Sequence, residues 1–311
     1  MIAAMKIGHI IRRTRIDRPE RFRLADCDPA QTHGVDVDKN AAKQHLADDV
    51  VRLTDLQERL WAEDRWAVLV ILQAMDAGGK DGIIKHVMAG INPQGCEVHS
   101  FKMPSAEELD HDYLWRSARA LPERGRVGIF NRSYYEEVLI ARVHADVLAG
   151  EKMPKELVTP RIWRQRFEDI RAFERMLARN GTLVLKFFLH ISKEEQRRRF
   201  LDRLEQPAKR WKFSMNDIAE RSLWDRYMEA YDEMIRATSH AAGRWHVVPA
   251  DDKPFARLVV AAAMVEALDR LDLAFPKVTG AALSRLNKVR KALLAEKPAA
   301  KGRGRRRGPA R

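Results

Sequence analysis

Residues 66–72 (WAVLVIL) form a continuous apolar run rich in branched side chains. Such a run is typical of a strand that is buried on both faces, as in parallel sheets covered by helices on either side. Parallel neighbours must be joined by long crossovers, which are usually helical. The run therefore predicts an α/β fold built around a parallel sheet.

Three further segments have the same character and lie far apart along the chain. They are residues 126–130 (RVGIF), 182–189 (TLVLKFFL) and 245–249 (WHVVP). Between them the pattern is helical. Residues 39–64, for example, repeat apolar side chains at spacings of three and four, from Leu46 to Leu60. Ser105 with Glu108, and Ser192 with Glu195, fit the capping box that opens a helix.

The predicted strand at 66–72 runs directly into a glycine loop, a lysine and a predicted helix. A phosphate group needs backbone N–H groups without bulky side chains, the positive end of a helix and a nearby cation. The loop matches the P-loop template G-x-x-x-x-G-K-[ST] only in part, because Ala74 replaces the first glycine and Asp81 replaces the hydroxyl residue. We expect phosphate binding at Ala77, Gly78, Gly79, Lys80, Asp81 and Gly82.

A carboxylate can hold a hard cation where the template has a hydroxyl group. Asp76 lies inside the loop and Asp81 follows Lys80, and we favour Asp76 as the metal ligand. The alternative for the whole segment is a tight turn between a strand and a helix, with no ligand.

The second predicted strand ends in Asn131, Arg132 and, one turn later, Glu136. Phosphate-binding α/β folds usually place a metal-orienting aspartate at this position. A neutral amide is a weaker ligand, so we expect Glu136 to supply the missing charge and to act with Asp76 and Asn131 as a metal ligand. Arg132 would meet phosphate oxygens with its planar fork. The alternative for Glu136 is an ordinary acidic first turn of a helix.

Residues 196–214 hold seven basic side chains against two acidic ones. A basic segment that closes over a phosphate loop would neutralise charge and exclude water, so we expect a lid at about 197–216. A solvated helix face is the alternative. The lid candidates are Arg198, Arg199, Arg203, Lys209, Arg210 and Lys212. Four other basic residues, Lys102, Arg116, Arg142 and Lys186, are unranked candidates for a polyanion groove.

The net charge of +13 is concentrated at the end of the chain. Residues 285–311 hold eleven Lys or Arg and one acidic residue, for a net charge of +10, which leaves +3 for the other 284 residues. Residues 1–284 therefore lack the charge excess that is typical of a nucleic-acid-binding domain. Nucleic acid is expected to contact only the basic tail, if it binds at all. We expect an extended N-terminal arm at 1–38, a P-loop domain at 39–275 and a basic, disordered tail at 276–311.

Neither a membrane span nor a secretory signal is predicted. The longest apolar run is interrupted at Gln73, and the apolar start precedes Arg12 and Arg13 instead of following them. Cys27 and Cys96 are too few for a disulfide scaffold. We expect a cytoplasmic protein without a membrane partner.

Five motifs in order resemble the second polyphosphate kinase family, the polyphosphate:nucleotide phosphotransferases. They are residues 75–82 (MDAGGKDG), 92–95 (NPQG), 100–105 (SFKMPS), 130–136 (FNRSYYE) and 211–214 (WKFS). The resemblance covers about residues 20–270. It implies a P-loop kinase-like fold of three α/β/α layers with a helical lid, and reversible transfer of the terminal phosphoryl group of inorganic polyphosphate to a nucleotide.

The resemblance also implies roles for particular residues. Asp76 and Lys80 match the acid and lysine of the family's first phosphate motif, and Asn131 and Arg132 match its second. Asn131 with Glu136 is similar to the subgroup that phosphorylates both AMP and ADP to give ATP. Magnesium is implied as the cofactor, with Mn2+ as an alternative, and a dimer or tetramer as the assembly.

The residues alone leave two other functions open. An ATP-dependent nucleoside or nucleoside monophosphate kinase would use the same sequence of strand, loop, lysine and helix. A nucleic-acid-binding P-loop protein would depend on the basic tail and bind in a strongly salt-dependent way.

Overall fold

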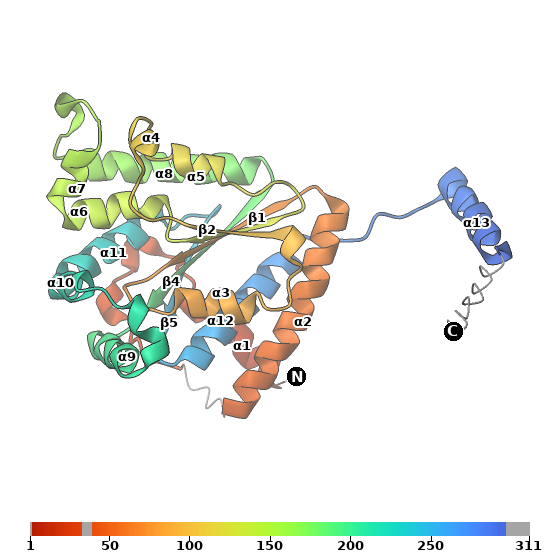
Figure 1. Cartoon of the computed structure of the whole chain (residues 1–311), viewed down its shortest axis with the longest axis horizontal. Helices are drawn as coiled ribbons and strands as arrows, with labels where there is room; N and C mark the ends of the chain where they lie inside the picture. Colours follow the sequence, from red (N-terminus) through yellow and green to blue (C-terminus); the bar gives the residue numbers. More distant parts are fainter. Residues whose placement is uncertain (1, 33–38, 297–311) are drawn as a thin grey trace, which may run out of the picture. The chain divides into compact units, whose positions relative to one another are not determined.

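The computed structural model describes residues 2–32 and 39–296. The chain divides into two compact units, Met1–Ala274 and Phe275–Arg311, and each is considered by itself. The first unit contains the sheet (Figure 1). The second contains one described helix, α13 (Gly280–Ala295).

The sheet has five strands in the order β2-β3-β1-β4-β5, and all neighbouring strands are parallel. The strands are β1 (Ala67–Gln73), β2 (Cys96–Ser100), β3 (Val127–Asn131), β4 (Thr182–His190) and β5 (Trp245–Pro249). This confirms the predicted α/β class and the four predicted strands. Strand β2, at one edge of the sheet, was not predicted, because it is only partly buried and carries polar residues at Glu97 and His99.

Helices connect the strands and cover the sheet. The α-helices of the first unit are α1 (Ile2–Thr14), α2 (Lys39–Glu63), α3 (Lys80–Val87), α4 (Ala106–Leu109), α5 (Trp115–Arg119), α6 (Ile140–Val143), α7 (Ala145–Gly150), α8 (Ile162–Arg179), α9 (Lys193–Glu205), α10 (Asn216–Ser222), α11 (Trp224–Thr238) and α12 (Lys253–Asp269). Short 3-10 turns are η1 (Pro19–Arg21), η2 (Leu24–Asp26), η3 (Pro93–Gly95), η4 (Tyr134–Val138), η5 (Lys155–Leu157) and η6 (Pro207–Lys212).

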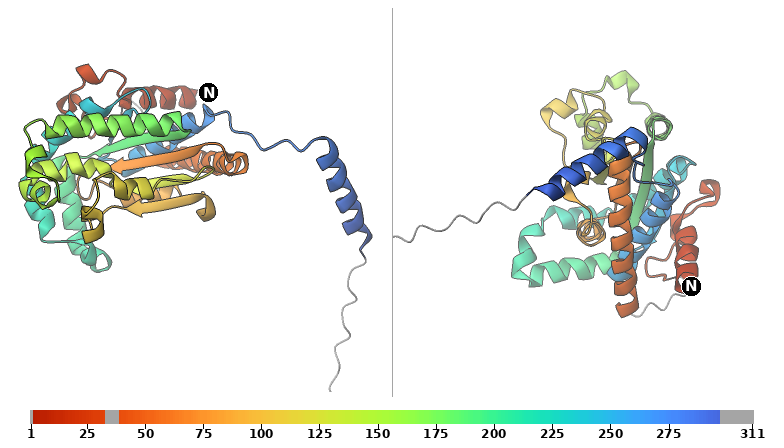
Figure 2. Two further views of the ribbon diagram at one scale, coloured as in Figure 1. Left: turned by 90° about the horizontal axis from the view of Figure 1, so that it is seen from above. Right: turned by 90° about the vertical axis from the view of Figure 1, so that its right-hand side faces the viewer.

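Two helical layers enclose the sheet, as the three-layer prediction requires. Helices α1, α2, α3 and α12 pack together on one face, and α6, α8 and α11 pack together on the other (Figures 1 and 2). All seven residues of β1 are buried. The apolar run at 66–72 thus occupies the centre of the sheet because it is the strand that both layers cover.

The N-terminal segment differs from the prediction of an extended arm. Residues Ile2–Thr14 form helix α1, which packs against α12 and β5. Ile10 and Ile11 are buried in the core, and Ile7 packs against it. These three residues share a helical face, and this periodicity outweighs the turn signals that follow at Pro19 and Pro29.

The expected disorder of the tail is wrong for residues 280–295, which form α13. The low-complexity segment 297–311 lies outside the described residues. Of the two predicted capping boxes, that of Ser105 and Glu108 is complete. At α9 only half forms: the Ser192 hydroxyl accepts from the Glu195 N–H, while the Ser192 N–H donates to Asp251 instead.

The strand order creates a crevice at one edge of the sheet. From central β1 the chain continues to β2 and β3 on one side, and then crosses to β4 and β5 on the other. Ligands of open α/β sheets bind outside the carboxyl ends of the strands at such a switch point. The glycine loop after β1 and Asn131 at the end of β3 both lie there.

Candidate active site

The loop between β1 and α3 is shaped by its small residues. A Cβ atom on Gly78 would lie 2.5 Å from the Ala74 Cβ and 2.8 Å from the Met75 carbonyl oxygen. Gly79 caps α3 with φ of +107°, a conformation that side chains disfavour. The loop therefore folds tightly and brings the amino end of α3 to the crevice, where its free N–H groups attract anions.

Lys80 is the first residue of α3, and its side chain turns back into the loop. Its Nζ donates to the Ala74 carbonyl oxygen over 2.8 Å. Burial, together with the nearby charge of Arg132, lowers the pKa of Lys80 to about 8. The ammonium group is thus held where an anion would restore its full charge.

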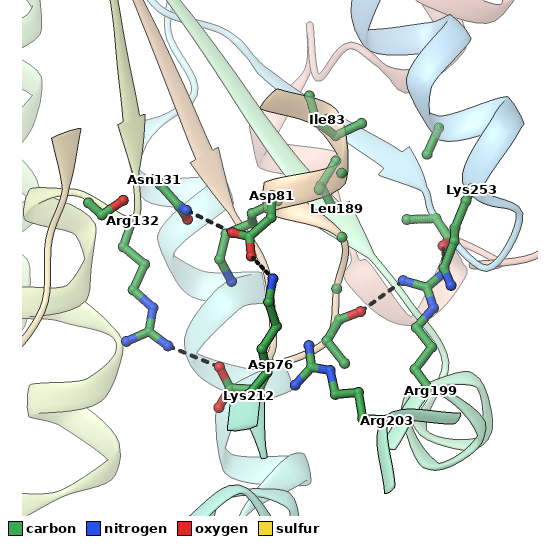
Figure 3. Close-up of a pocket in the computed structure, with 18 of the residues that line it drawn as sticks. Asp76, Asp81, Ile83, Asn131, Arg132, Leu189, Arg199, Arg203, Lys212 and Lys253 are labelled. Carbon is green, nitrogen blue, oxygen red and sulfur yellow. Dashed lines mark hydrogen bonds and ion pairs between the residues drawn. The ribbon is translucent and has the colours of Figure 1, made fainter. Parts of the chain in front are cut away.

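Arg132 and Asp76 join the ends of β3 and β1. The Arg132 Nη2 donates to the Asp76 Oδ1 over 2.9 Å (Figure 3). Leu72 of β1 lies opposite Asn131 of β3, and this register places the residues that follow each strand side by side. Glu136, above all, and Asp76 raise the pKa of Arg132, so the guanidinium keeps its charge.

Glu136 was predicted to act with Asn131 as a metal ligand, and the carboxylate that the Asn131 amide contacts is that of Asp81. The Asn131 Nδ2 donates to the Asp81 Oδ1 over 3.1 Å, and the Lys212 Nζ lies 3.4 Å from the Asp81 Oδ2. Burial alone would raise the pKa of Asp81, but the bonds from Asn131 and Lys212 outweigh it and lower the pKa. Glu136 instead accepts a bond from Gln73 over 3.0 Å and is not among the residues that line the cavity.

The predicted lid at about 197–216 covers most of α9 and all of η6 and ends where α10 begins, and its first part contacts the glycine loop. The Arg199 Nη1 donates to the Ala77 carbonyl oxygen over 2.9 Å, and its Nη2 donates to the Asp251 carbonyl oxygen over 3.2 Å. The Gln196 Nε2 donates to the Asp76 carbonyl oxygen over 2.9 Å. One end of α9 is therefore tied both to the glycine loop and to the segment after β5.

The six predicted lid residues separate into two groups. Arg199, Arg203, Lys209 and Lys212 line the cavity. Arg198 and Arg210 are not among its lining residues: Arg198 pairs with Glu195, and the Arg210 Nε donates to the Leu204 carbonyl oxygen.

The unranked basic candidates also separate. Lys102 lines the cavity. The other three form ion pairs elsewhere, Arg116 with Glu137, Arg142 with Glu233 and the fully buried Lys186 with Glu174. Their side chains thus serve the packing of the domain.

Sequence reasoning missed Lys253 and Arg257, which lie one turn apart on α12 and line the cavity. Burial and the charge of Arg199 lower the pKa of both. Neither forms an ion pair with a described residue. The spacing of four residues between Lys253 and Arg257 indicates that they share one helical face. Only the fold shows that this face of α12 lies beside the glycine loop.

Together these elements enclose a cavity of about 720 Å³ at the carboxyl edge of the sheet (Figure 3). Its lining holds nine cationic side chains against four carboxylates. The cations are Lys80, Lys102, Arg132, Arg199, Arg203, Lys209, Lys212, Lys253 and Arg257, and the carboxylates are Asp76, Asp81, Asp202 and Asp217. A site of this composition binds a multiply charged anion.

A comparison with protein families decides between the readings of this site. The polyphosphate kinase 2 family matches residues 36–276, which include the whole cavity. The chain belongs to the polyphosphate kinase 2 family. It is therefore a phosphotransferase, and the resemblance drawn from the five motifs is confirmed.

Relatives within the polyphosphate kinase 2 family cover most of the chain. An ADP-polyphosphate phosphotransferase of Rhodopseudomonas palustris is 53% identical over 81% of this chain and 89% of its own. An AMP/ADP-polyphosphate phosphotransferase of Meiothermus ruber is 47% identical over 86% of this chain and 96% of its own. The crystal structure of polyphosphate kinase 2 from Arthrobacter aurescens matches with a TM-score of 0.80 and 39% identity, over 89% of this chain and 98% of that chain.

Proposed function

We propose that this protein transfers the terminal phosphoryl group of inorganic polyphosphate to AMP and to ADP, reversibly, with Mg2+. The observation that carries the proposal is the excess of cations in the cavity around the glycine loop. Polyphosphate bears about one negative charge on each internal phosphate, so a long chain needs a series of cations and not a single one. The name of the Meiothermus ruber relative gives both acceptors, and the name of the Rhodopseudomonas palustris relative gives ADP.

The metal site can be assigned from the chemistry of its donors. Across the described residues no three acidic, histidine or cysteine side chains form a metal cluster. Mg2+ fits such a place, because it keeps several waters and binds through one or two carboxylates and substrate phosphates. Asp76 and Asp81 line the cavity with Asn131 and would hold it. When bound, it would neutralise charge on the phosphates.

In this proposal Glu136 does not bind the metal and acts through Arg132. Its carboxylate accepts from Gln73 and is the main cause of the raised pKa of Arg132. Glu136 would thus keep Arg132 charged and oriented, while Asp76 and Asp81 face the cavity. Mn2+ would use the same oxygen donors.

The protein residues would position the phosphates and stabilise charge, which is what phosphoryl transfer requires. Lys80 and Arg132 would flank the phosphoryl group in transit. An oxygen of the acceptor phosphate attacks in line, the bond from the end phosphorus to its bridging oxygen breaks, and the shortened chain leaves with that oxygen. Since the attacking oxygen is already largely ionised at neutral pH, the reaction needs no strong general base.

The two sides of the glycine loop would serve different parts of the substrates. On the α12 side, Lys253 and Arg257 form no ion pair with a described residue and would hold the phosphates of the donor chain. On the β3 side, Arg132 pairs with Asp76, and this mixed charge suits the smaller nucleotide. A homo-oligomer stays a prediction, to be measured by light scattering.

The test is nucleotide production by the purified protein with Mg2+ and polyphosphate, supplied with AMP, ADP or no acceptor. ADP and then ATP from AMP would support the proposal. Use of ADP alone would restrict the acceptor. A reaction that requires ATP as the donor, with polyphosphate inert, would refute it and favour an ordinary nucleotide kinase. The Lys80→Ala variant, checked for folding by circular dichroism, controls for contaminating kinases.

A further inference from the structure

Helix α13 (Gly280–Ala295) lies outside the part of the chain that the family shares, because the family match ends at residue 276. It also lies in a compact unit separate from the catalytic one. The reaction common to the family therefore does not account for this helix, and its side chains must be explained by themselves.

The apolar residues of α13 share one face. Leu283, Leu286, Val289 and Leu293 recur at spacings of three and four, and Leu294 lies at the border of the same face. The exposed fractions of these five side chains range from 48% to 71%. Five exposed aliphatic side chains on one helical face are costly in water, because removing apolar surface from water is favourable. This pattern is typical of a helix whose apolar face meets another apolar phase.

The charges of α13 are all of one sign. The helix holds Arg285, Lys288, Arg290 and Lys291 and no acidic residue. By helical geometry Arg285, Lys288 and Lys291 lie away from the apolar face, while Arg290 lies within it and is long enough to reach its border. After Glu296 the sequence adds seven more Lys or Arg up to Arg311.

These two properties together select the partner. A soluble polyanion such as RNA or polyphosphate would satisfy the cations and leave the leucines in water. A second copy of α13 would cover the leucines, but it would bring cations together with no acidic residue to pair them. An anionic lipid surface satisfies both, because acyl chains accept the apolar face and headgroups accept the cations.

We propose that α13 binds the surface of anionic lipid bilayers and lies in the plane of the interface. No helix in the described ranges is long and apolar enough to cross a bilayer, so contact is at the surface. The proposal departs from the expectation that the protein has no membrane partner. It does not depend on the substrates proposed above.

Vesicle sedimentation of the full-length protein tests the proposal. We expect binding to vesicles of phosphatidylcholine mixed with phosphatidylglycerol, and at least tenfold weaker binding to vesicles of phosphatidylcholine alone. Leu286→Gln with Leu293→Gln should weaken binding to the anionic vesicles at least tenfold. Lys288→Gln with Lys291→Gln should weaken it and reduce its dependence on salt. The matched control, Ala281→Gln with Ala295→Gln on the polar face, should bind within twofold of the unchanged protein.

The remaining outcomes would overturn the proposal. Equal binding to both kinds of vesicle, or no binding to either, would exclude an anionic lipid surface as the partner of α13. Undiminished binding by the Leu286→Gln and Leu293→Gln variant leaves only a charge effect. If RNA binds the full chain equally well with and without those leucines, and vesicles do not bind, the partner is a soluble polyanion. If the leucine variant changes the molecular mass in light scattering, the apolar face joins copies of the chain.

Discussion

The guanidinium of Arg132 holds the carboxylate of Asp76 through a bond of 2.9 Å, across the gap between the ends of β3 and β1. Arg132 adopts φ of +65°, a left-handed conformation that is uncommon outside glycine. Strain of this kind persists only where surrounding contacts fix the residue. The pair therefore sets the distance between the glycine loop and the end of the neighbouring strand.

The first prediction concerns this pair. Asp76→Asn and Arg132→Lys should each lower kcat by about 10²-fold or more, because the first removes a preorganised charge and the second removes the planar fork of donors that positions the phosphate oxygens. The double variant should lose much less than the product of the two, since the residues act as a unit. Initial rates with polyphosphate and ADP measure this. Full additivity, with circular dichroism unchanged, would show that the pair does not act together.

The second prediction concerns pH and Lys80. Its pKa is lowered to about 8, so the free enzyme loses this cation as the pH rises through 8. We expect kcat/KM for polyphosphate to fall above about pH 8. Because bound phosphates restore the proton, kcat should fall only at higher pH. An active Lys80→Arg variant should not show the fall in kcat/KM near pH 8. If the unchanged protein and the variant both show this fall, another group causes it.

The third prediction concerns the cations of α12. Lys253→Gln with Arg257→Gln should raise KM for long polyphosphate about tenfold or more, the equivalent of ~1.4 kcal/mol, and leave KM for ADP within twofold. The control is Arg164→Gln, an exposed residue of α8 that pairs with Glu168. An increase in KM for ADP instead would place the nucleotide on the α12 side of the loop.

The fourth prediction concerns stability. Glu174 and Lys186 are fully buried, and the Lys186 Nζ lies 2.6 Å from the Glu174 Oε2. Burial alone would raise the pKa of Glu174, but the charge of Lys186 and bonds from His240 and Tyr135 lower it. Glu174→Gln leaves a buried ammonium group without its counter-ion and should cost about 3–5 kcal/mol. Glu174→Gln with Lys186→Met should cost less.

Urea unfolding at pH 7, with slopes compared between variants, measures this difference. The same network fixes Tyr134 and Tyr135, whose hydroxyls both donate to Glu174. An equal or larger loss in the double variant would show that packing, and not charge, is what the pair provides.

The strands could be predicted from the sequence wherever burial on both faces requires apolar residues. The runs that became β1, β3, β4 and β5 are apolar because helices cover both faces of the sheet. Strand β2 is only partly buried, so Glu97 and His99 are tolerated and its sequence carries little signal, whereas β5 at the other edge is fully buried beside α1 and α12. Helix α1 was read as extended because its three core residues are few beside the turn residues that follow.

The site could be predicted where neighbours in sequence are also neighbours in space. The glycine loop and Lys80 satisfy this condition. Whether Asn131 would meet Asp81 or Glu136 depends on the parallel register of β1 and β3, which no local pattern determines. Lys253 and Arg257 were missed for the same reason, since they come to the loop from the far end of the domain.

The contacts of Arg199 and Gln196 with the glycine loop have a mechanical consequence. The start of α9 cannot swing outward without breaking bonds to Asp76 and Ala77. Gln206, with φ of −93° and ψ of 108°, is the non-helical link between α9 and η6 and is the first place where rotation would leave those bonds intact. We therefore expect any closing movement of the lid to turn at Gln206, so that the segment beyond it moves while the glycine loop keeps its shape.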